Sequence, residues 1–413
     1  MTDTFDAPTS LDQAGYKRLV IATCIPKFAS DLVEQLAILF PEDPQIAEDL
    51  LYDLCVEVNP GLEIHRVNLR SRDEVVTQQA RVRELATRDS DPFWDHLTQV
   101  SRGLERRLLK KIHGQDEAVA TVAQVVKRAA AGLSPIDRPL GSLLFIGHTG
   151  TGKTELCRQL AAEFALGHQA PQDNLVRIDC SEYALAHEYS KLLGSPPGYV
   201  GHEDGGLLTR ALRETPGAVV LFDEIEKAHP RLHNLMLQVL EEGCLTDGRG
   251  ERVRLDRNLV MMTSNAGAEE IRDAGRAVGF HPDPSLTKES VGEITKRALA
   301  NQFSPEFLGR IDQMVVFPEL DGIAATEIAR DQLVALALRA RQRGARVSFT
   351  AAVARWVTKH GFSRESGARE LRSVIQTRVE PALAELLLSE LIGEDDLVRG
   401  RIRLDELQLL IEQ

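Results

Sequence analysis

An eight-residue glycine-rich segment, Gly147–Thr154 (GHTGTGKT), restricts the fold of this chain more than any other feature. It lies between an apolar run, Leu143–Ile146, and a helical pattern. Glycines at a strand-to-helix turn let backbone N–H groups surround phosphate oxygens, and the helix N-terminus attracts negative charge. We expect an ATP site in which Lys153 contacts the β- and γ-phosphates and the Thr154 hydroxyl holds Mg²⁺. The residues expected at the phosphates are Gly147, His148, Thr149, Gly150, Thr151, Gly152, Lys153 and Thr154.

Two acids follow directly after another apolar run, Val219–Phe222. Ligands of parallel sheets lie at the carboxyl ends of the strands, so Asp223 and Glu224 are expected beside the phosphate loop. We expect Asp223 to bind Mg²⁺ and Glu224 to orient and deprotonate the attacking water. The alternative interpretation is a solvated pair of surface acids.

The fold class follows from short apolar runs that are separated by helical patterns. The runs are Leu143–Ile146, Leu175–Ile178, Val219–Phe222 and Val260–Met262. This alternation indicates a parallel sheet that helices cover on both faces. We therefore expect an α/β fold, with a mostly helical pattern after Phe317. The expected parts are a small α/β N-terminal domain at 1–102, a large α/β subdomain at 103–318 and a small helical subdomain at 319–413.

Charge and cysteine usage exclude several classes of protein. The net charge is −13, and residues 1–60 are strongly acidic, which argues against nucleic acid as the main partner. The five cysteines are scattered with no CxxC pair, which argues against a structural zinc site or a disulfide framework. The first ten residues do not read as a signal peptide, and no apolar run has the length of a membrane span. We expect a cytoplasmic protein.

Five further segments carry motifs that support a family assignment. They are Ile112–Ala118 (IHGQDEA), Asp223–His229 (DEIEKAH), Thr263–Asn265 (TSN), Phe303–Asp312 (FSPEFLGRID) and Gly367–Leu371 (GAREL). With the glycine-rich loop, they make residues 104–376 resemble the ATPase module of the Clp-type AAA+ protein unfoldases. The resemblance is closest to the second ATPase module of the two-module members ClpA, ClpB and ClpC.

This resemblance implies a role for each motif. Ile112 and His113 would pack on the adenine, and Asn265 would act as sensor 1, positioning the water near the γ-phosphate. Arg310 would be an arginine finger that reaches the ATP of the neighbouring subunit, and Arg369 would be sensor 2, touching the γ-phosphate.

Both arginines also have plainer interpretations. Arg310 could form a surface ion pair with Asp312, and Arg369 could be a charge on a helix surface. This chain also has Gly309 where the family usually has Asn.

Two loops resemble the pore loops of these unfoldases. The segment Lys191–Gly201 exposes Tyr199 and Val200 between glycines, and the family uses such an aromatic to grip a substrate polypeptide inside a homohexameric ring. Leu245–Gly250 resembles the second pore loop and fits a hairpin tip. The alternatives are a tyrosine packed on a neighbouring surface and a plain surface turn.

Three interpretations are open for the process that ATP hydrolysis by this chain would drive. The tripeptide Val278, Gly279 and Phe280 resembles the peptidase-docking tripeptide of ClpC, which implies an unfoldase that feeds a ClpP-type peptidase. The alternative is a stand-alone remodelling or disaggregating ATPase, and the third is a DNA-processing ATPase, which the acidic charge opposes. The partners expected are protein substrates, further copies of this chain, the peptidase and an adaptor at the N-terminal domain.

Overall fold

The computed structural model describes residues 91–412, apart from residues 136, 166–173, 186–187, 195–204, 268–294, 296, 364–365 and 390–395. The chain divides into two compact units, Met1–Asp95 and His96–Gln413. Nearly all of the first unit lies outside the described residues, and with it most of the N-terminal domain expected at 1–102. Within the part that is described, no helix is both long and apolar enough to cross a membrane.

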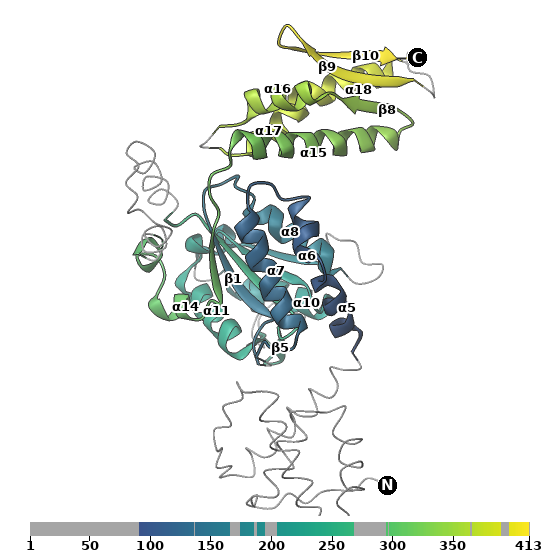
Figure 1. Cartoon of the computed structure of the whole chain (residues 1–413). Coiled ribbons are helices and arrows are strands. Elements are labelled where there is room, and N and C mark those ends of the chain that lie inside the picture. Colours follow the sequence, from purple (N-terminus) through teal and green to yellow (C-terminus); the bar gives the residue numbers. More distant parts are fainter. Residues whose placement is uncertain are drawn as a thin grey trace, which may run out of the picture. The chain divides into compact units, whose positions relative to one another are not determined.

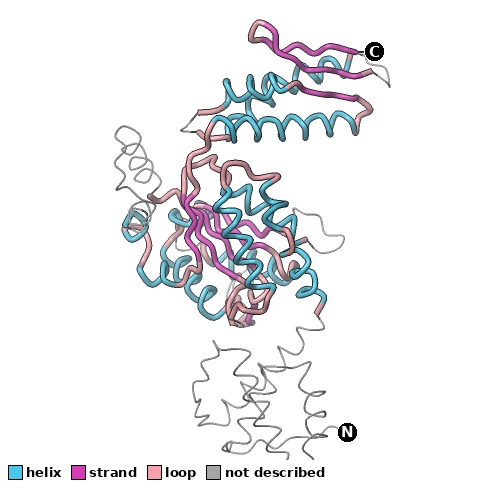
Figure 2. The backbone as a smooth tube through the Cα atoms, viewed as in Figure 1, coloured by secondary structure: helices cyan, strands magenta, loops and turns pink. Residues whose placement is uncertain are grey.

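A parallel sheet forms the centre of the second unit (Figures 1 and 2). It has five strands in the order β2-β3-β6-β1-β7. Three of the four apolar runs become the central strands β1, β3 and β6, which are buried along their whole length, and the fourth becomes the edge strand β2. The predicted α/β fold with a parallel sheet is therefore confirmed. The strands are β1 (Gly141–Ile146), β2 (Leu175–Asp179), β3 (Val219–Asp223), β6 (Leu259–Ser264) and β7 (Gln313–Val316).

Helices cover both faces of this sheet. One face packs on α10 and α11, whose apolar side chains share a core cluster with alternate residues of β1, β3 and β6. The opposite face of β1 meets α7, because Gly141 lies against Val125 of that helix. The helices are α5 (Pro92–Ser101), α6 (Leu104–Leu109), α7 (Asp116–Ala130), α8 (Lys153–Phe164), α9 (Ser190–Leu193), α10 (Leu207–Glu214), α11 (Pro230–Glu242) and α14 (Pro305–Gly309), with short turns η1 (Cys180–Tyr183) and η2 (Ile225–Lys227).

The C-terminal part, residues 320–412, is helical as expected and has its own core around Trp356 and Leu371. It also contains a three-stranded sheet, β10-β9-β8, that the sequence analysis did not foresee. Its elements are α15 (Gly322–Arg341), β8 (Arg346–Phe349), α16 (Ala351–Gly361), α17 (Arg369–Val374), η3 (Ile375–Val379), α18 (Glu380–Leu388), β9 (Leu397–Arg403) and β10 (Glu406–Glu412).

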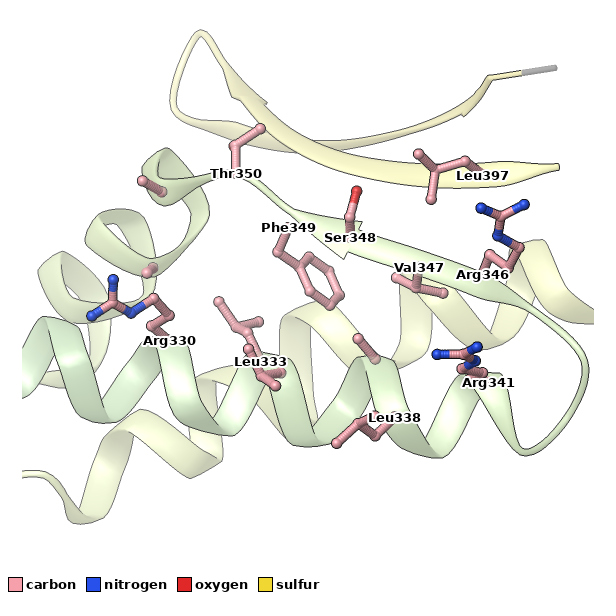
Figure 3. Close-up of a pocket in the computed structure, with 14 residues that line it drawn as sticks. Arg330, Leu333, Leu338, Arg341, Arg346, Val347, Ser348, Phe349, Thr350 and Leu397 are labelled. Carbon is pink, nitrogen blue, oxygen red and sulfur yellow. The ribbon is translucent and has the colours of Figure 1, made fainter. Parts of the chain in front are cut away.

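A pocket of about 500 Å³ opens in the C-terminal part between α15 and β8 (Figure 3). Its apolar lining includes Leu338, Val347 and Phe349, and Arg341 and Arg346 also line it. No residue of the glycine-rich loop lines this pocket, so it is separate from the predicted ATP site.

The contact between Gly141 and α7 gives a test of how closely that helix packs on the sheet. A Cβ at Gly141 would lie 2.3 Å from Cγ1 of Val125. We expect Gly141→Ala to destabilise the protein by about 1–3 kcal/mol through overpacking. Adding Val125→Ala removes the clashing methyl group and should recover part of that loss. The midpoints of urea unfolding for the two single variants and the double variant measure this, and strictly additive shifts would contradict the packing.

Candidate functional site

The glycine-rich loop connects β1 to α8 at the carboxyl edge of the sheet. Gly150 and Gly152 have φ angles of 80° and 103°, which residues with a Cβ rarely adopt. The helix begins at Lys153, directly after this turn. The backbone therefore has the strand–loop–helix form that the sequence predicted for phosphate binding.

Lys153 is almost fully buried and uses all three of its N–H donors. Its Nζ donates to the carbonyl oxygens of Gly147 at 2.5 Å and His148 at 2.8 Å. The third bond goes to Oδ1 of Asn265, at 3.0 Å. Burial lowers the pKa of Lys153 to about 8, against the raising effect of the carboxylates of Glu226 and Asp223. The structure thus brings the predicted phosphate-binding lysine and the predicted sensor 1 residue into direct contact.

The carboxylate of Asp223 is the most connected group of the site. Its Oδ1 accepts hydrogen bonds from the hydroxyls of Thr263, at 2.5 Å, and Thr154, at 3.4 Å. Its Oδ2 accepts from Arg177, with Nε at 3.0 Å and Nη2 at 2.7 Å. Asp223 and the predicted Mg²⁺ partner Thr154 therefore lie together.

These two oxygens fit the magnesium ion that an ATP site implies. The Thr154 hydroxyl and Asp223 Oδ1 are close enough for one cation to contact both, and hard oxygen ligands of this kind are those that Mg²⁺ prefers. When bound, the ion would neutralise charge on the phosphates.

Glu224 adopts a left-handed backbone, with φ of 57°. Its N–H donates to the same Thr263 hydroxyl that binds Asp223, at 3.0 Å, which holds the two acids in fixed relation. Its carboxylate accepts from Lys227 at 2.6 Å. Two residues further on, the Glu226 carboxylate accepts a hydrogen bond from the backbone N–H of Asn265 at 3.1 Å. This bond connects the segment after β3 to the segment after β6.

The predicted adenine segment precedes α7 and connects it to other elements. Ile112 is buried, and Nε2 of His113 lies 2.7 Å from Oδ2 of Asp331 on α15. Gln115 donates to the carbonyl oxygens of Thr151 in the glycine-rich loop, at 3.0 Å, and Pro318, at 3.1 Å. This segment therefore contacts both the phosphate loop and the C-terminal part.

The two predicted arginines are placed differently. Arg369 is exposed and lies close enough to the phosphate loop for its charge to act on Lys153. Beside it, the N–H of Ala368 donates to the carbonyl of Gly150 at 3.1 Å. Arg310 instead forms an ion pair with Glu241 of α11 at 2.6 Å.

The plain interpretation of Arg310 as a partner of Asp312 is not what the structure shows. Asp312 accepts hydrogen bonds from the N–H and hydroxyl of Ser142, at 2.8 and 3.1 Å, and lies 3.6 Å from Arg128. The carboxylate therefore anchors the start of β1, and Arg310 pairs elsewhere.

The loop predictions are described only in part. Tyr199, Val200, Val278, Gly279 and Phe280 lie outside the described residues. The hairpin expected near Leu245–Gly250 is present as β4 (Cys244–Thr246) paired with β5 (Arg252–Arg254). Its turn is held by buried Asp247, which accepts the N–H groups of Arg249 and Glu251 and the guanidinium of Arg213.

The sequence analysis assigned no role to three residues of the site, although two of them, Thr263 and Glu226, stand inside the motifs it named. Arg177 and Thr263 bind the Asp223 carboxylate, and Glu226 holds the backbone of Asn265. Alternation along β2 and β3 was an available signal, because Arg177 stands two positions before the end of its strand on the face that Asp223 shares.

Comparisons with known proteins agree with this geometry. Residues 138–314 match a family model described as AAA domain (Cdc48 subfamily). Residues 320–399 match one described as the C-terminal, D2-small domain of ClpB protein. In a solved structure of Hsp104 with ATPγS and FITC casein in its closed state, a chain aligns with a TM-score of 0.67 and 31% identity, over 97% of this chain and 64% of that one.

Three curated relatives show how far the similarity extends. The probable chaperone protein ClpB 1 of Chlorobaculum tepidum is 42% identical over 72% of this chain and 66% of its own length. The ClpC ATP-binding subunit of the Clp protease from Staphylococcus saprophyticus is 43% identical, over 69% and 34%. A ClpA homologue of Pyropia yezoensis is 35% identical over 94% and 49%, an alignment long enough to include part of residues 1–102. This chain therefore spans between one third and two thirds of these relatives.

The lowered pKa of Lys153 predicts that nucleotide binding takes up a proton. Above pH 8 most of the free protein carries a neutral Lys153, and phosphate oxygens beside the amine would raise its pKa. Binding should take up a substantial fraction of a proton per site at about pH 8.5 and much less near pH 7, so affinity should fall as pH rises through 8. Titration calorimetry of MgATP in buffers of different ionisation enthalpy measures the uptake. Equal uptake at both pH values would contradict it.

Proposed function

Because this chain belongs to the Clp-type AAA+ ATPases, we propose that it is an ATP-driven unfoldase that threads polypeptides through the pore of a homohexameric ring. The observation that carries the proposal is the meeting of Lys153, Asp223 and Asn265 at the carboxyl edge of the sheet. The relatives are named as chaperones and as ATP-binding subunits of the Clp protease, and the aligned Hsp104 structure contains casein. These names support a protein substrate for this chain.

The proposed hydrolysis uses residues whose positions fit their tasks. Lys153 exchanges its bond to Asn265 for a phosphate oxygen, which frees the Asn265 amide to orient the attacking water. Glu224 accepts a proton from that water. The hydroxyl of Thr263 holds the backbone of Glu224 in place. Ile112 and His113 would contact the adenine, and Arg369 would respond to the γ-phosphate from the C-terminal part.

A ring is proposed because Arg310, within the part of the chain that the structure describes, pairs with Glu241 and not with a residue of the phosphate loop. As an arginine finger it would contribute about 10³–10⁵ in rate to a neighbouring site. We expect Arg310→Ala and Lys153→Ala proteins to be inactive alone and partly active when mixed, because some sites then combine an intact finger with an intact loop. ATPase assays of the mixtures test this. Glu241→Gln is the control that should keep activity, and full activity of Arg310→Ala would contradict the role.

Threading is proposed to depend on Tyr199, which lies outside the phosphate site in sequence. We expect Tyr199→Ala to hydrolyse ATP at close to the normal rate while losing the unfolding of a stable tagged protein, because an alanine offers no bulk to grip a chain. Tyr199→Phe keeps the aromatic side chain and should still unfold the tagged protein. Fluorescence of a tagged green fluorescent protein reports the unfolding. Undiminished unfolding by Tyr199→Ala would make this tyrosine a structural residue.

We propose that the unfolded substrate is delivered to a ClpP-type peptidase. The docking tripeptide would be Val278, Gly279 and Phe280. Repeated apolar contacts around a ring can hold two rings together even when each contact is weak. We expect Phe280→Ala to lose ATP-dependent degradation by the cognate peptidase while still unfolding the substrate, and Phe280→Leu to retain much of it. Equal degradation by wild type and Phe280→Ala would favour stand-alone remodelling.

A further inference from the structure

Arg177 of β2 contacts one oxygen of the Asp223 carboxylate, which is expected to bind Mg²⁺ at the proposed ATP site. Its Nη2 and Nε lie 2.7 and 3.0 Å from Oδ2 of Asp223. The hydroxyl of Thr154 lies 3.4 Å from Oδ1 and 3.5 Å from Oδ2 of Asp223, so it reaches both oxygens of the carboxylate. A Mg²⁺ ion held beside the Thr154 hydroxyl would therefore lie next to the carboxylate oxygen that Arg177 contacts.

A second carboxylate lies within reach of the same guanidinium. Oδ2 of Asp179 is 3.8 Å from Nη2 of Arg177, while Oδ1 of Asp179 accepts the hydroxyl and N–H of Ser181. The register of β2 and β3 places Asp179 directly opposite Asp223. The Arg177 side chain is 43% exposed, so it can move between the two acids without crossing the core.

From this geometry we propose that Arg177 is a positioning residue that competes with Mg²⁺ for Asp223 and moves to Asp179 when the ion and nucleotide bind. A guanidinium and a divalent ion a few ångströms apart repel each other, so one carboxylate serves both only at a cost in affinity. Asp179 lowers that cost because it receives the displaced charge. The inference rests on the proposed ATP site but not on unfolding or on a peptidase.

The proposal fixes the sign of two substitutions. Arg177→Gln removes the competitor, so the Mg²⁺ concentration that half-saturates nucleotide binding should fall about threefold or more. Asp179→Asn removes the second acceptor, so that concentration should rise about threefold or more. In the double variant the effect of Asp179→Asn should largely disappear, because the Arg177 guanidinium that Asp179 would bind is no longer present. A charge effect of Asp179 acting directly on the ion would persist in the double variant.

The experiment is a Mg²⁺ titration of this whole 413-residue chain with a fluorescent, slowly hydrolysed ATP analogue, and the anisotropy of the analogue reports nucleotide binding. Arg177→Lys keeps a cation and should stay near wild type, and Arg158→Gln removes an exposed arginine of α8 that pairs with Glu155 and should change nothing. Thermal unfolding of each variant confirms that it is folded. An unchanged or raised Mg²⁺ requirement in Arg177→Gln, or an undiminished Asp179 effect in the double variant, would overturn the proposal. Absence of nucleotide binding by wild type would overturn the ATP site itself.

Discussion

The carboxylate of Asp223 is the group on which the geometry of this site depends. It stands at the end of β3 and takes hydrogen bonds from side chains of β2, β6 and α8, so four elements are fixed relative to one another at a single buried charge. Burying a carboxylate is costly unless hydrogen bonds and opposite charges satisfy it. The hydroxyl of Thr263 extends this order to Glu224, because it bonds both acids.

A second set of contacts connects the same edge of the sheet to the C-terminal part. Gly150 of the phosphate loop bonds the backbone of Ala368, and His113 pairs with Asp331. Gln115 donates hydrogen bonds to the phosphate loop and to Pro318, which stands just before the C-terminal part begins. These contacts connect the phosphate loop directly to α15 and to the start of α17, so a change in the loop on nucleotide binding would reach both helices.

Much of the α/β fold could be predicted, because it depends on local patterns. Apolar runs gave four of the five parallel strands, and the glycine-rich loop located the site.

The small sheet of the C-terminal part was missed for a physical reason. Its β9–β10 hairpin turns at Leu404 and Asp405, both at positive φ, where a sequence would normally show asparagine or glycine. Tertiary contacts compensate, since Trp356 donates to the carbonyl of Asp405 and Lys359 pairs with its carboxylate. The alternation that places Arg177 on the same face as Asp223 was overlooked, because the two residues lie 46 positions apart on different strands.

The junction between Gly150 and the turn before α17 has a consequence for how sequences of this kind diverge. A Cβ on Gly150 would lie 2.3 Å from the carbonyl oxygen of Ser366, and one on Gly367 would lie 2.7 Å from the carbonyl oxygen of Gly150. The junction is made by main-chain atoms, so the identities of the neighbouring side chains do not encode it. Homologues could exchange most residues around this junction and keep it intact, whereas a single methyl group at either glycine would force the two backbones apart.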